Sequence, residues 1–324
     1  MTADRMHPED ESGLPPDVQG TVVTVGTFDG VHRGHQLVLR RLADRAHEVR
    51  LKSVLVTFEP HPLEVVNPAA APPLLTIGLE RTEVVAESGI DYLAVVPFTP
   101  TLRGYSAEAF VDVILRGRFR MRELLIGHDH GFGRGREGDV EVLQALGAQR
   151  GFRVEVIAPV SLGDGRPISS TSIRRAVAGG DLQRAAAGLG RPYGISGVVV
   201  GGEQRGRLLG FPTLNLASPS PRKLLPPEGV YAVRVQTPSG PLGGMMNLGP
   251  RPTFGDTATS LEVHAFDGGG DWYGASIRVD FIARMRDTMK FSGSAELVAQ
   301  LRRDADQARA ILARNSVDSV ALLR

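Results

Sequence analysis

The sequence contains no cysteine and few aromatic residues, which make up 6% of the chain. Without cysteine there are no disulfides, thiol nucleophiles or cysteine metal sites, as expected for a reducing compartment. No apolar run approaches the roughly 20 residues that a membrane-spanning helix needs. An excess of charge of one sign is also missing, because 37 Lys and Arg against 36 Asp and Glu leave a net charge of +1. These absences predict a cytoplasmic protein that binds neither nucleic acid nor a membrane surface.

A length of 324 residues predicts two domains, and a hydrophobic content of 42% is sufficient to build a core in each. Residues 1–20 are polar, acidic and proline-containing, and they lack the apolar stretch of a signal peptide. They are predicted to form a flexible tail.

Strands and helices are predicted to alternate over residues 21–182. The expected strands are short β-branched or apolar runs at 21–25, 52–58, 92–96, 123–126 and 152–157. Helical patterns begin near Gln36, after a cap at Thr76, after a cap at Ser106, and at Val140. Continuous β-branched runs separated by helices predict an α/β domain with a doubly wound parallel sheet. Ligands of such sheets bind at the carboxyl ends of the strands.

The alternation stops near residue 182, and a linker is predicted at 183–194. Residues 195–324 contain short strands divided by Gly and Pro, at 197–201, 229–236, 243–247, 260–266 and 276–282. This pattern predicts a small antiparallel β-barrel, closed or nearly closed. A terminal helix is expected from Ser294, with one apolar face formed by Leu297, Leu301, Ala305, Ala308 and Ile311.

The stretch at residues 26–35, GTFDGVHRGH, lies between the first strand and the first helix. Gly26, Gly30 and Gly34 let the backbone approach a ligand closely, and the free N–H groups of the helix start suit a phosphate. His32 and His35 lie one helical turn apart, so both imidazoles can face the same phosphate. The alternatives are an ordinary strand–glycine–helix turn, a metal-binding histidine pair, or a solvated turn.

Three further stretches are expected at the same edge of the sheet. Residues 58–62, FEPHP, bring Phe58 and His61 to a strand exit stiffened by proline, which is otherwise simply a rigid loop. Residues 127–139, GHDHGFGRGREGD, are rich in glycine and charge and predict a functional loop. Residues 168–174, ISSTSIR, offer four hydroxyl groups and a guanidinium at a helix start, or an ordinary N-cap at Ser169 or Ser170.

With Phe28 and Asp29, the first stretch resembles the H-x-G-H signature of nucleotidyltransferases and, in its full form, the FAD synthetase branch. The FxPHP, Gly-x-Asp-x-x-Phe-Gly and ISSTxIR motifs follow in the order found in bacterial bifunctional riboflavin kinase/FAD synthetases. The resemblance implies a turn for cofactor binding formed by Gly26, Phe28, Asp29, Gly30 and Gly34. It implies that the phosphates of ATP are handled by His32, His35, Ser170, Thr171 and Arg174. It also implies that Phe58, His61 and Asp129 lie towards FMN. His130 departs from the pattern, because many members have an aromatic residue there.

The reaction implied by the resemblance needs no nucleophilic side chain. The phosphate of FMN attacks the α-phosphorus of ATP, and pyrophosphate leaves. Catalysis then consists of positioning the reactants and stabilising charge, for which imidazoles, hydroxyls, helix N–H groups and a guanidinium are suitable. Mg²⁺ is expected with the leaving pyrophosphate, held mainly by phosphate oxygens and water.

The second domain opens with residues 201–215, GGEQRGRLLGFPTLN, which pattern alone allows as a hairpin with an arginine-rich tip. Its G-R-x-L-G-F-P-T-x-N core is similar to the signature of riboflavin kinases, and the later stretches GVY, NLGPRPTF, LEVH and KF agree. The similarity implies a binding role for Gly206, Arg207, Gly210, Thr213, Asn215 and Arg286. Thr213 and Asn215 would hold Mg²⁺ and nucleotide phosphates, and Arg286 would contribute to the flavin site. Leu214 and Thr288 depart from the alanine and glutamate that are common in the family.

Glu262 is implied to be the general base for the ribityl 5′-hydroxyl, since an alcohol is a poor nucleophile until its proton is accepted. Strand alternation places it opposite to Leu261 and Val263. The alternative is a solvent-facing carboxylate, which is commoner for an isolated Glu.

The sequence thus predicts a bifunctional enzyme that phosphorylates riboflavin to FMN and adenylylates FMN to FAD, with ATP and Mg²⁺. One alternative is a nucleotidyltransferase for another phosphate ester with a degenerate second domain. The other is a flavin-sensing regulatory protein without turnover.

Overall fold

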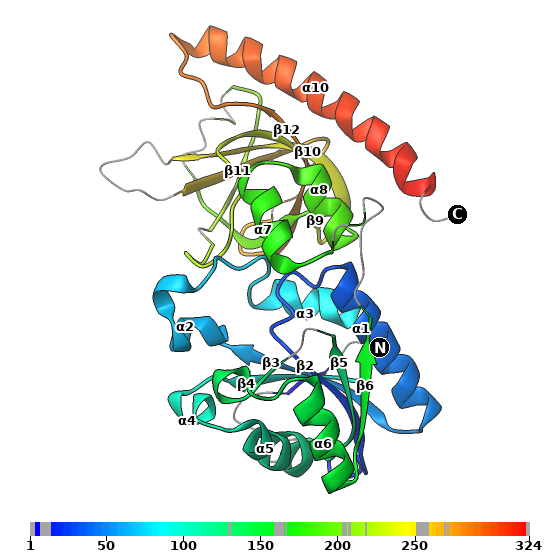
Figure 1. Ribbon diagram of the computed structural model, residues 1–324. Helices are drawn as coiled ribbons and strands as arrows, with labels where there is room; N and C mark the ends of the chain where they lie inside the picture. The colour runs from blue at the N-terminus through cyan, green and yellow to red at the C-terminus, as the bar shows by residue number, and fades with distance from the viewer. Residues whose placement is uncertain are drawn as a thin grey trace. The chain divides into compact units, whose positions relative to one another are not determined.

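The computed structural model describes residues 4–6, 14–128, 131–158, 165, 167–202, 206, 209–217, 219–250, 259–268, 270 and 272–321. The chain divides into two compact units, Met1–Ser170 and Thr171–Arg324. Each unit is described by itself (Figure 1).

The first unit is built on a six-stranded sheet in which every neighbouring pair of strands is parallel. In the order β1-β4-β3-β2-β5-β6, its strands are β1 (Asp4–Met6), β4 (Tyr92–Pro97), β3 (Lys52–Glu59), β2 (Thr21–Val25), β5 (Met121–Gly127) and β6 (Arg153–Ile157). This confirms the predicted parallel sheet. The chain winds outward from β2 through β3 to β4 and then returns to the other side of β2. The winding therefore reverses between β2 and β5, where ligands of doubly wound sheets bind.

Helices cover both faces of this sheet (Figure 1). One face packs against α1 (Arg33–Glu48) and α3 (Leu79–Ala86). The other packs against α4 (Pro100–Arg103), α5 (Ala107–Ala109), its π-helical continuation η2 (Phe110–Arg118) and α6 (Val140–Arg150). Three short elements lie in the connections: α2 (Pro62–Val66), η1 (Pro68–Ala70) and η3 (Arg134–Arg136). The two apolar layers account for the alternation of buried strands and helices in the sequence.

Part of the segment predicted as a flexible tail is packed on the first unit. Leu14 and Val18 are buried in the core that α5 and α6 cover. The Arg120 guanidinium donates to the carbonyl oxygens of Pro15 and Val18. In addition, β1 pairs with β4 in parallel. The structure differs from the expectation because two apolar side chains in a polar segment are enough to anchor it.

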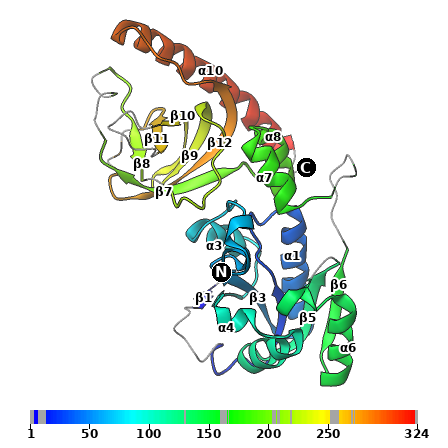
Figure 2. The ribbon, with the colours of Figure 1, turned by 60° about the vertical axis from the view of Figure 1, so that its left-hand side comes forward.

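The second unit is a closed six-stranded barrel (Figure 2). Its strands run β10-β11-β8-β7-β12-β9, and all neighbours are antiparallel. Their bounds are β7 (Gly194–Val200), β8 (Leu214–Leu216), β9 (Gly229–Thr237), β10 (Gly240–Pro250), β11 (Thr259–Ala265) and β12 (Ser276–Arg286). The predicted barrel is confirmed.

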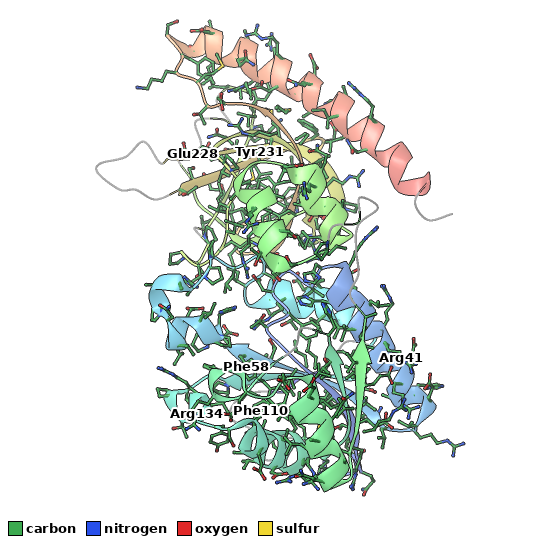
Figure 3. The ribbon with its side chains drawn as sticks, viewed as in Figure 1. Arg41, Phe58, Phe110, Arg134, Glu228 and Tyr231 are labelled. Atoms are coloured by element: carbon green, nitrogen blue, oxygen red, sulfur yellow. The ribbon has the colours of Figure 1, made fainter. Side chains whose placement is uncertain are left out.

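The terminal helix α10 (Ser294–Ala321) packs against β9, β10 and β12. Ala308 is fully buried against Ala232, Met245 and Phe266, and Leu301, Ala305 and Ile311 pack on the same cluster. This contact confirms the apolar face predicted from the 3.6-residue period. Tyr231 lies on the opposite face of β9 and is fully buried (Figure 3).

The predicted linker at 183–194 is instead part of the second unit. Helix α7 (Ser170–Ala178) begins at the division between the units, and α8 (Leu182–Leu189) contacts β12. Tyr193 is buried, and its hydroxyl donates to the carbonyl oxygen of Leu224 at 2.6 Å. The division therefore lies before residues 183–194, because α8 has an apolar face that packs.

Candidate functional site

The glycine–histidine turn (residues 26–35) follows β2 at the place where the sheet winding reverses. Phe28 and Val31 have φ angles of +46° and +41°, in a region that side-chain-bearing residues rarely adopt, and Gly30 has a φ of +81°. Phe28 and Val31 are both buried in the core under α1 and α3. Apolar packing thus holds a strained backbone at the predicted phosphate site.

Glycines in this turn make room for rings of the turn itself. A Cβ on Gly26 would lie 3.0 Å from the Phe28 ring, and one on Gly34 would lie 3.1 Å from the Cε1 of His32. The sequence analysis explained these glycines by the close approach of a ligand. The structure adds a second reason, because side chains at Gly26 and Gly34 would crowd the rings of the turn itself.

The Asp29 carboxylate is buried and binds the chain ahead of α3. It accepts from the backbone N–H groups of Leu75 and Thr76, each at 2.9 Å. The Thr76 hydroxyl in turn accepts from the N–H of Gly30 at 3.0 Å. Thr76 was predicted to cap a helix, but α3 begins at Leu79, so that prediction was wrong. The hydroxyl is engaged by the turn, and the contacts of Asp29 indicate that it shapes the turn.

His32 is the N-cap of α1. Its Nδ1 accepts from the backbone N–H of His35 at 3.3 Å, and the two imidazoles stack with centroids 3.7 Å apart. Because Nδ1 acts as an acceptor, a neutral His32 carries its proton on Nε2. The two rings are stacked, and their contact with a shared phosphate stays a prediction.

His35 is held in its neutral form. Burial, and then the neighbouring His32, lower the pKa of the His35 imidazole well below its usual 6.5. Its Nδ1 is buried and has no hydrogen-bond partner within the described part of the chain. His35 therefore acts near pH 7 as a neutral group in the turn.

We predict that this imidazole makes the protein less stable in mild acid. The folded pKa lies below the unfolded pKa, so the unfolded chain takes up a proton first. The stabilisation is complete above about pH 6.5 and is lost below it, by at most about 1.4 kcal/mol per pH unit. His35→Gln removes this titration. Urea unfolding between pH 7.5 and 5.0 should show a steeper loss of stability for the wild type than for the variant, and equal slopes would contradict the prediction.

The exit of β3 carries Phe58 and His61. Phe58 is only 7% exposed, and its ring lies 5.4 Å from that of Phe98 and 6.1 Å from that of Phe110 (Figure 3). His61 is the N-cap of α2 and accepts from the N–H of Leu63 through Nδ1. Both residues therefore have structural roles at the predicted edge of the sheet.

The loop after β5 is tied to the start of α5. The Phe132 ring lies 5.0 Å from that of Phe110, and the N–H of Ala107 donates to the Glu137 carboxylate at 3.0 Å. Phe110 and Phe132 thus extend the aromatic cluster of Phe58 into this loop. Sequence reasoning missed Phe110, because it belongs to the helical pattern after Ser106. Asp129 and His130 lie outside the described residues.

Arg81 is a second residue that the sequence analysis missed. Its side chain is 11% exposed, and its guanidinium reaches the Thr27 carbonyl oxygen and the Glu59 carboxylate, each at 3.5 Å. It places a positive charge at the ends of β2 and β3. No motif marks it, since it lies in an unremarkable helical stretch.

The motif at 168–174 reaches the turn through Ser170, whose hydroxyl donates to the Asp29 carbonyl oxygen at 2.9 Å. Thr171 and Arg174 follow on α7 and belong to the second unit. Their roles at the phosphates stay predictions.

In the second unit, the strand register aligns the predicted kinase residues. Asn215 of β8 pairs with Glu262 of β11, which pairs with Asn247 of β10. Asn247 in turn pairs with Val230 of β9, and Val230 with Arg286 of β12. Directly opposed residues point to the same face of a sheet. These five residues therefore form a cross-strand row on one face of the barrel wall.

Within this row, the Glu262 carboxylate accepts a hydrogen bond from a neighbouring residue of β11. The Ser260 hydroxyl donates to its Oε1 at 2.9 Å, and its side chain is half-buried. Leu261 and Val263 are buried on the opposite face of β11, as the alternation predicted.

The turn before β8 is fastened to β11. The Nδ1 of His264 lies 2.8 Å from the Pro212 carbonyl oxygen, and the N–H of Phe211 donates to the Gly206 carbonyl oxygen at 2.8 Å. These contacts bring Thr213 next to the cross-strand row. Gly210 has a φ of +81° and allows the turn. Arg207 lies outside the described residues.

The Arg286 side chain binds the terminal helix. Its guanidinium donates to the Asp304 carboxylate through Nε at 3.0 Å and Nη2 at 2.6 Å, and Asp304 is 1% exposed. This ion pair joins β12 to α10, and the contribution of Arg286 to the flavin site stays a prediction.

The donor set around Asn215 suits Mg²⁺. The Thr213 hydroxyl, just before β8, and the Asn215 amide oxygen on β8 are hard oxygen ligands. Within the described ranges no group of three or more His, Asp or Glu side chains is arranged to hold a metal ion. Phosphate oxygens would therefore supply the remaining ligands.

Comparisons with known proteins match each unit to an enzyme family. The FAD synthetase family matches residues 14–172, and the riboflavin kinase family matches residues 189–312. A bifunctional riboflavin kinase/FMN adenylyltransferase of Escherichia coli (strain K12) is 40% identical over 292 residues, covering 90% of this chain and 92% of the relative. One from Pseudomonas fluorescens is 40% identical over 301 residues, covering 93% and 96%.

A solved structure, described as a macrolide-efflux protein from Streptococcus pneumoniae, is also similar. Its TM-score is 0.82 at 29% sequence identity, over 95% of this chain and 99% of that one. In the part of the chain that the structure describes, no helix has the length and apolar character to cross a membrane.

Proposed function

Because this chain belongs to the family of bifunctional riboflavin kinase/FMN adenylyltransferases, we propose that its two activities use the two sites described above. The chain is an enzyme with both activities. The glycine–histidine turn would serve FMN adenylylation, and the cross-strand row would serve riboflavin phosphorylation. The supporting observation is that the stacked histidines of the turn lie in the first unit and the aligned residues of the cross-strand row lie in the second.

In the first unit, the phosphate oxygen of FMN would attack the α-phosphorus of ATP. The bond from the α-phosphorus to the bridging oxygen breaks, and pyrophosphate leaves. The His32 imidazole and the first-turn N–H groups of α1 other than that of His35, which donates to His32, would donate to phosphate oxygens at the turn. Such donors, fixed in advance, stabilise the charge of the transition state without reorganising.

The aromatic cluster of Phe58, Phe110 and Phe132 would face the isoalloxazine side of FMN. Flat aromatic rings stack well on one another, and the cluster connects the β3 exit with the loop after β5. His61, next to Phe58 in that exit, would lie on the same side.

In the second unit, Glu262 would accept the proton of the ribityl 5′-hydroxyl. The hydroxyl oxygen then bonds to the γ-phosphorus of ATP, and ADP leaves. Ser260 holds one carboxylate oxygen, so the orientation of Glu262 is set before the substrate binds. Thr213 and Asn215 would hold Mg²⁺, which when bound would offset the negative charge of the phosphates. We place both reactions in the cytoplasm, where ATP is available.

An assay of flavin products tests this function. Purified protein with riboflavin, ATP and Mg²⁺ should form FMN and then FAD and pyrophosphate, as measured by chromatography. Removing Mg²⁺ with EDTA should stop both steps, and adding it back should restore them. FAD formed only from supplied FMN would indicate a degenerate second unit. Riboflavin binding without turnover would indicate a flavin sensor.

A further inference from the structure

Asn247 lies beside Glu262 in the cross-strand row, although no role has been assigned to it. It pairs with Glu262 directly, in the antiparallel register of β10 and β11. Opposed residues of this kind have Cβ atoms about 4.5–5.5 Å apart. A group held by the Asn247 amide therefore lies within reach of the Glu262 carboxylate.

The other members of the row have different surroundings. Arg286 is bound to the buried Asp304, and Val230 is apolar and buried. Asn215 is crowded by the backbone of Gly202, where a Cβ would lie 2.0 Å from its Nδ2. Asn247 is exposed, and its side chain makes no hydrogen bond to any residue that the structure describes. Among the described residues of the barrel, no side-chain contact accounts for a polar amide at this point.

Gly249 lies on the same face of β10 as Asn247, at a buried position. It pairs with Ser260, the residue that holds Glu262. A Cβ there would lie 3.4 Å from the Cγ2 of Thr288 and 4.0 Å from the Nδ2 of Asn247. Gly249 therefore adjoins both Thr288 and Asn247.

We propose that Asn247 is a substrate-binding residue of the kinase site, whose amide holds a hydroxyl of the ribityl chain beside Glu262. This proposal rests on the proposed role of the cross-strand row in phosphorylating riboflavin. A hydroxyl both donates and accepts hydrogen bonds, and a primary amide offers an acceptor oxygen and two N–H donors. With one hydroxyl on Asn247, the terminal hydroxyl of the same polyol is directed to the neighbouring carboxylate. The residue thus selects flavins that carry a polyol chain.

The test compares two flavins that differ in that chain. Riboflavin carries the ribityl hydroxyls, whereas lumiflavin has the same ring system with a methyl group instead. In Asn247→Ala, the dissociation constant of riboflavin should rise about tenfold, as expected for the loss of one hydrogen bond, and that of lumiflavin should stay the same. Quenching of flavin fluorescence measures both. The kcat/KM for FMN formation should fall by a similar factor, while FAD formation from supplied FMN is unchanged.

Two further variants control for structure. Asn247→Leu keeps the volume of the side chain without its hydrogen bonds and should behave like Asn247→Ala. Gln236→Ala removes another exposed amide, on the adjoining strand β9, and should change neither dissociation constant. Because Asn247 is exposed, thermal melting should remain close to that of the wild type.

Equal weakening of riboflavin and lumiflavin, or no weakening of either, would overturn the proposal. Its failure is distinguishable from failure of the kinase site itself. That site is tested by Glu262→Gln, whereas the Asn247 variants are judged by the difference between the two flavins.

Discussion

Replacing Glu262 by Gln is expected to lower the rate of FMN formation by about 10² to 10⁴, the usual range for the loss of a general base. Glutamine keeps the size of the side chain and can still accept from the Ser260 hydroxyl, which now lies 2.9 Å from Oε1. It cannot take the proton of the ribityl alcohol. The substitution therefore removes the proton acceptor and leaves the local geometry unchanged.

The measurement is a pair of assays on one purified variant. FMN formation from riboflavin should collapse, while the dissociation constant of riboflavin changes little, since the loss is confined to the transition state. FAD formation from supplied FMN should continue at the wild-type rate, because it uses the first unit. Ser260→Ala is a matched control that keeps the base and loosens its orientation, so its loss should be much smaller. Near-normal kinase turnover in Glu262→Gln would show that Glu262 is not the general base but a solvent-facing carboxylate of the strand.

The second large effect is expected at His32. Removing one preorganised donor of this kind costs about 10² to 10³ in kcat. We expect the His32 imidazole to act as such a donor through Nε2, because its Nδ1 accepts from the N–H of His35. Substitution of His32 should therefore reduce FAD formation by at least the lower factor, and FMN formation should remain nearly intact.

His32 also caps α1, so two variants are needed to separate catalysis from folding. His32→Ala loses both the cap and the imidazole, and a lost cap typically costs about 1 kcal/mol of stability. His32→Asn keeps an oxygen that can cap the helix and loses the imidazole, with its ring donor and its stacking on His35. Thermal melting should thus fall for the alanine variant and much less for the asparagine variant, while both lose FAD formation. Normal FAD formation by His32→Asn would show that the imidazole acts only as a cap.

Local patterns of the sequence were sufficient for the two architectures. Secondary structure was predictable for β2, β3 and the helix after Ser106. In each of them the spacing of apolar residues within the segment itself indicates a strand or a helix. The apolar face of α10 followed in the same way, since Leu301, Ala305 and Ala308 recur at helical spacing. The division into a parallel sheet and a barrel was therefore predictable.

Side-chain contacts between distant segments were not predictable in this way. Thr76 had the form of a helix cap, yet its hydroxyl accepts from Gly30, 46 residues away. Arg286 was assigned to the flavin, yet it pairs with Asp304 on α10. Leu14 and Val18 lie in a polar segment and still pack in the core. In each case the partner residue belongs to another helix, strand or loop. The pattern of residues along one segment therefore cannot predict the contact.

By itself, the sequence determined which residue types are available for each reaction and which turn or strand carries them. Histidines at 32 and 35, a carboxylate at 262 and an amide at 215 are identified by motif and spacing. Only the tertiary structure decided their neighbours, because strand register and helix packing are set by burying apolar faces over the whole unit. That register aligns Asn247 with Glu262, and the same packing stacks His32 on His35 and lowers the pKa of the His35 imidazole.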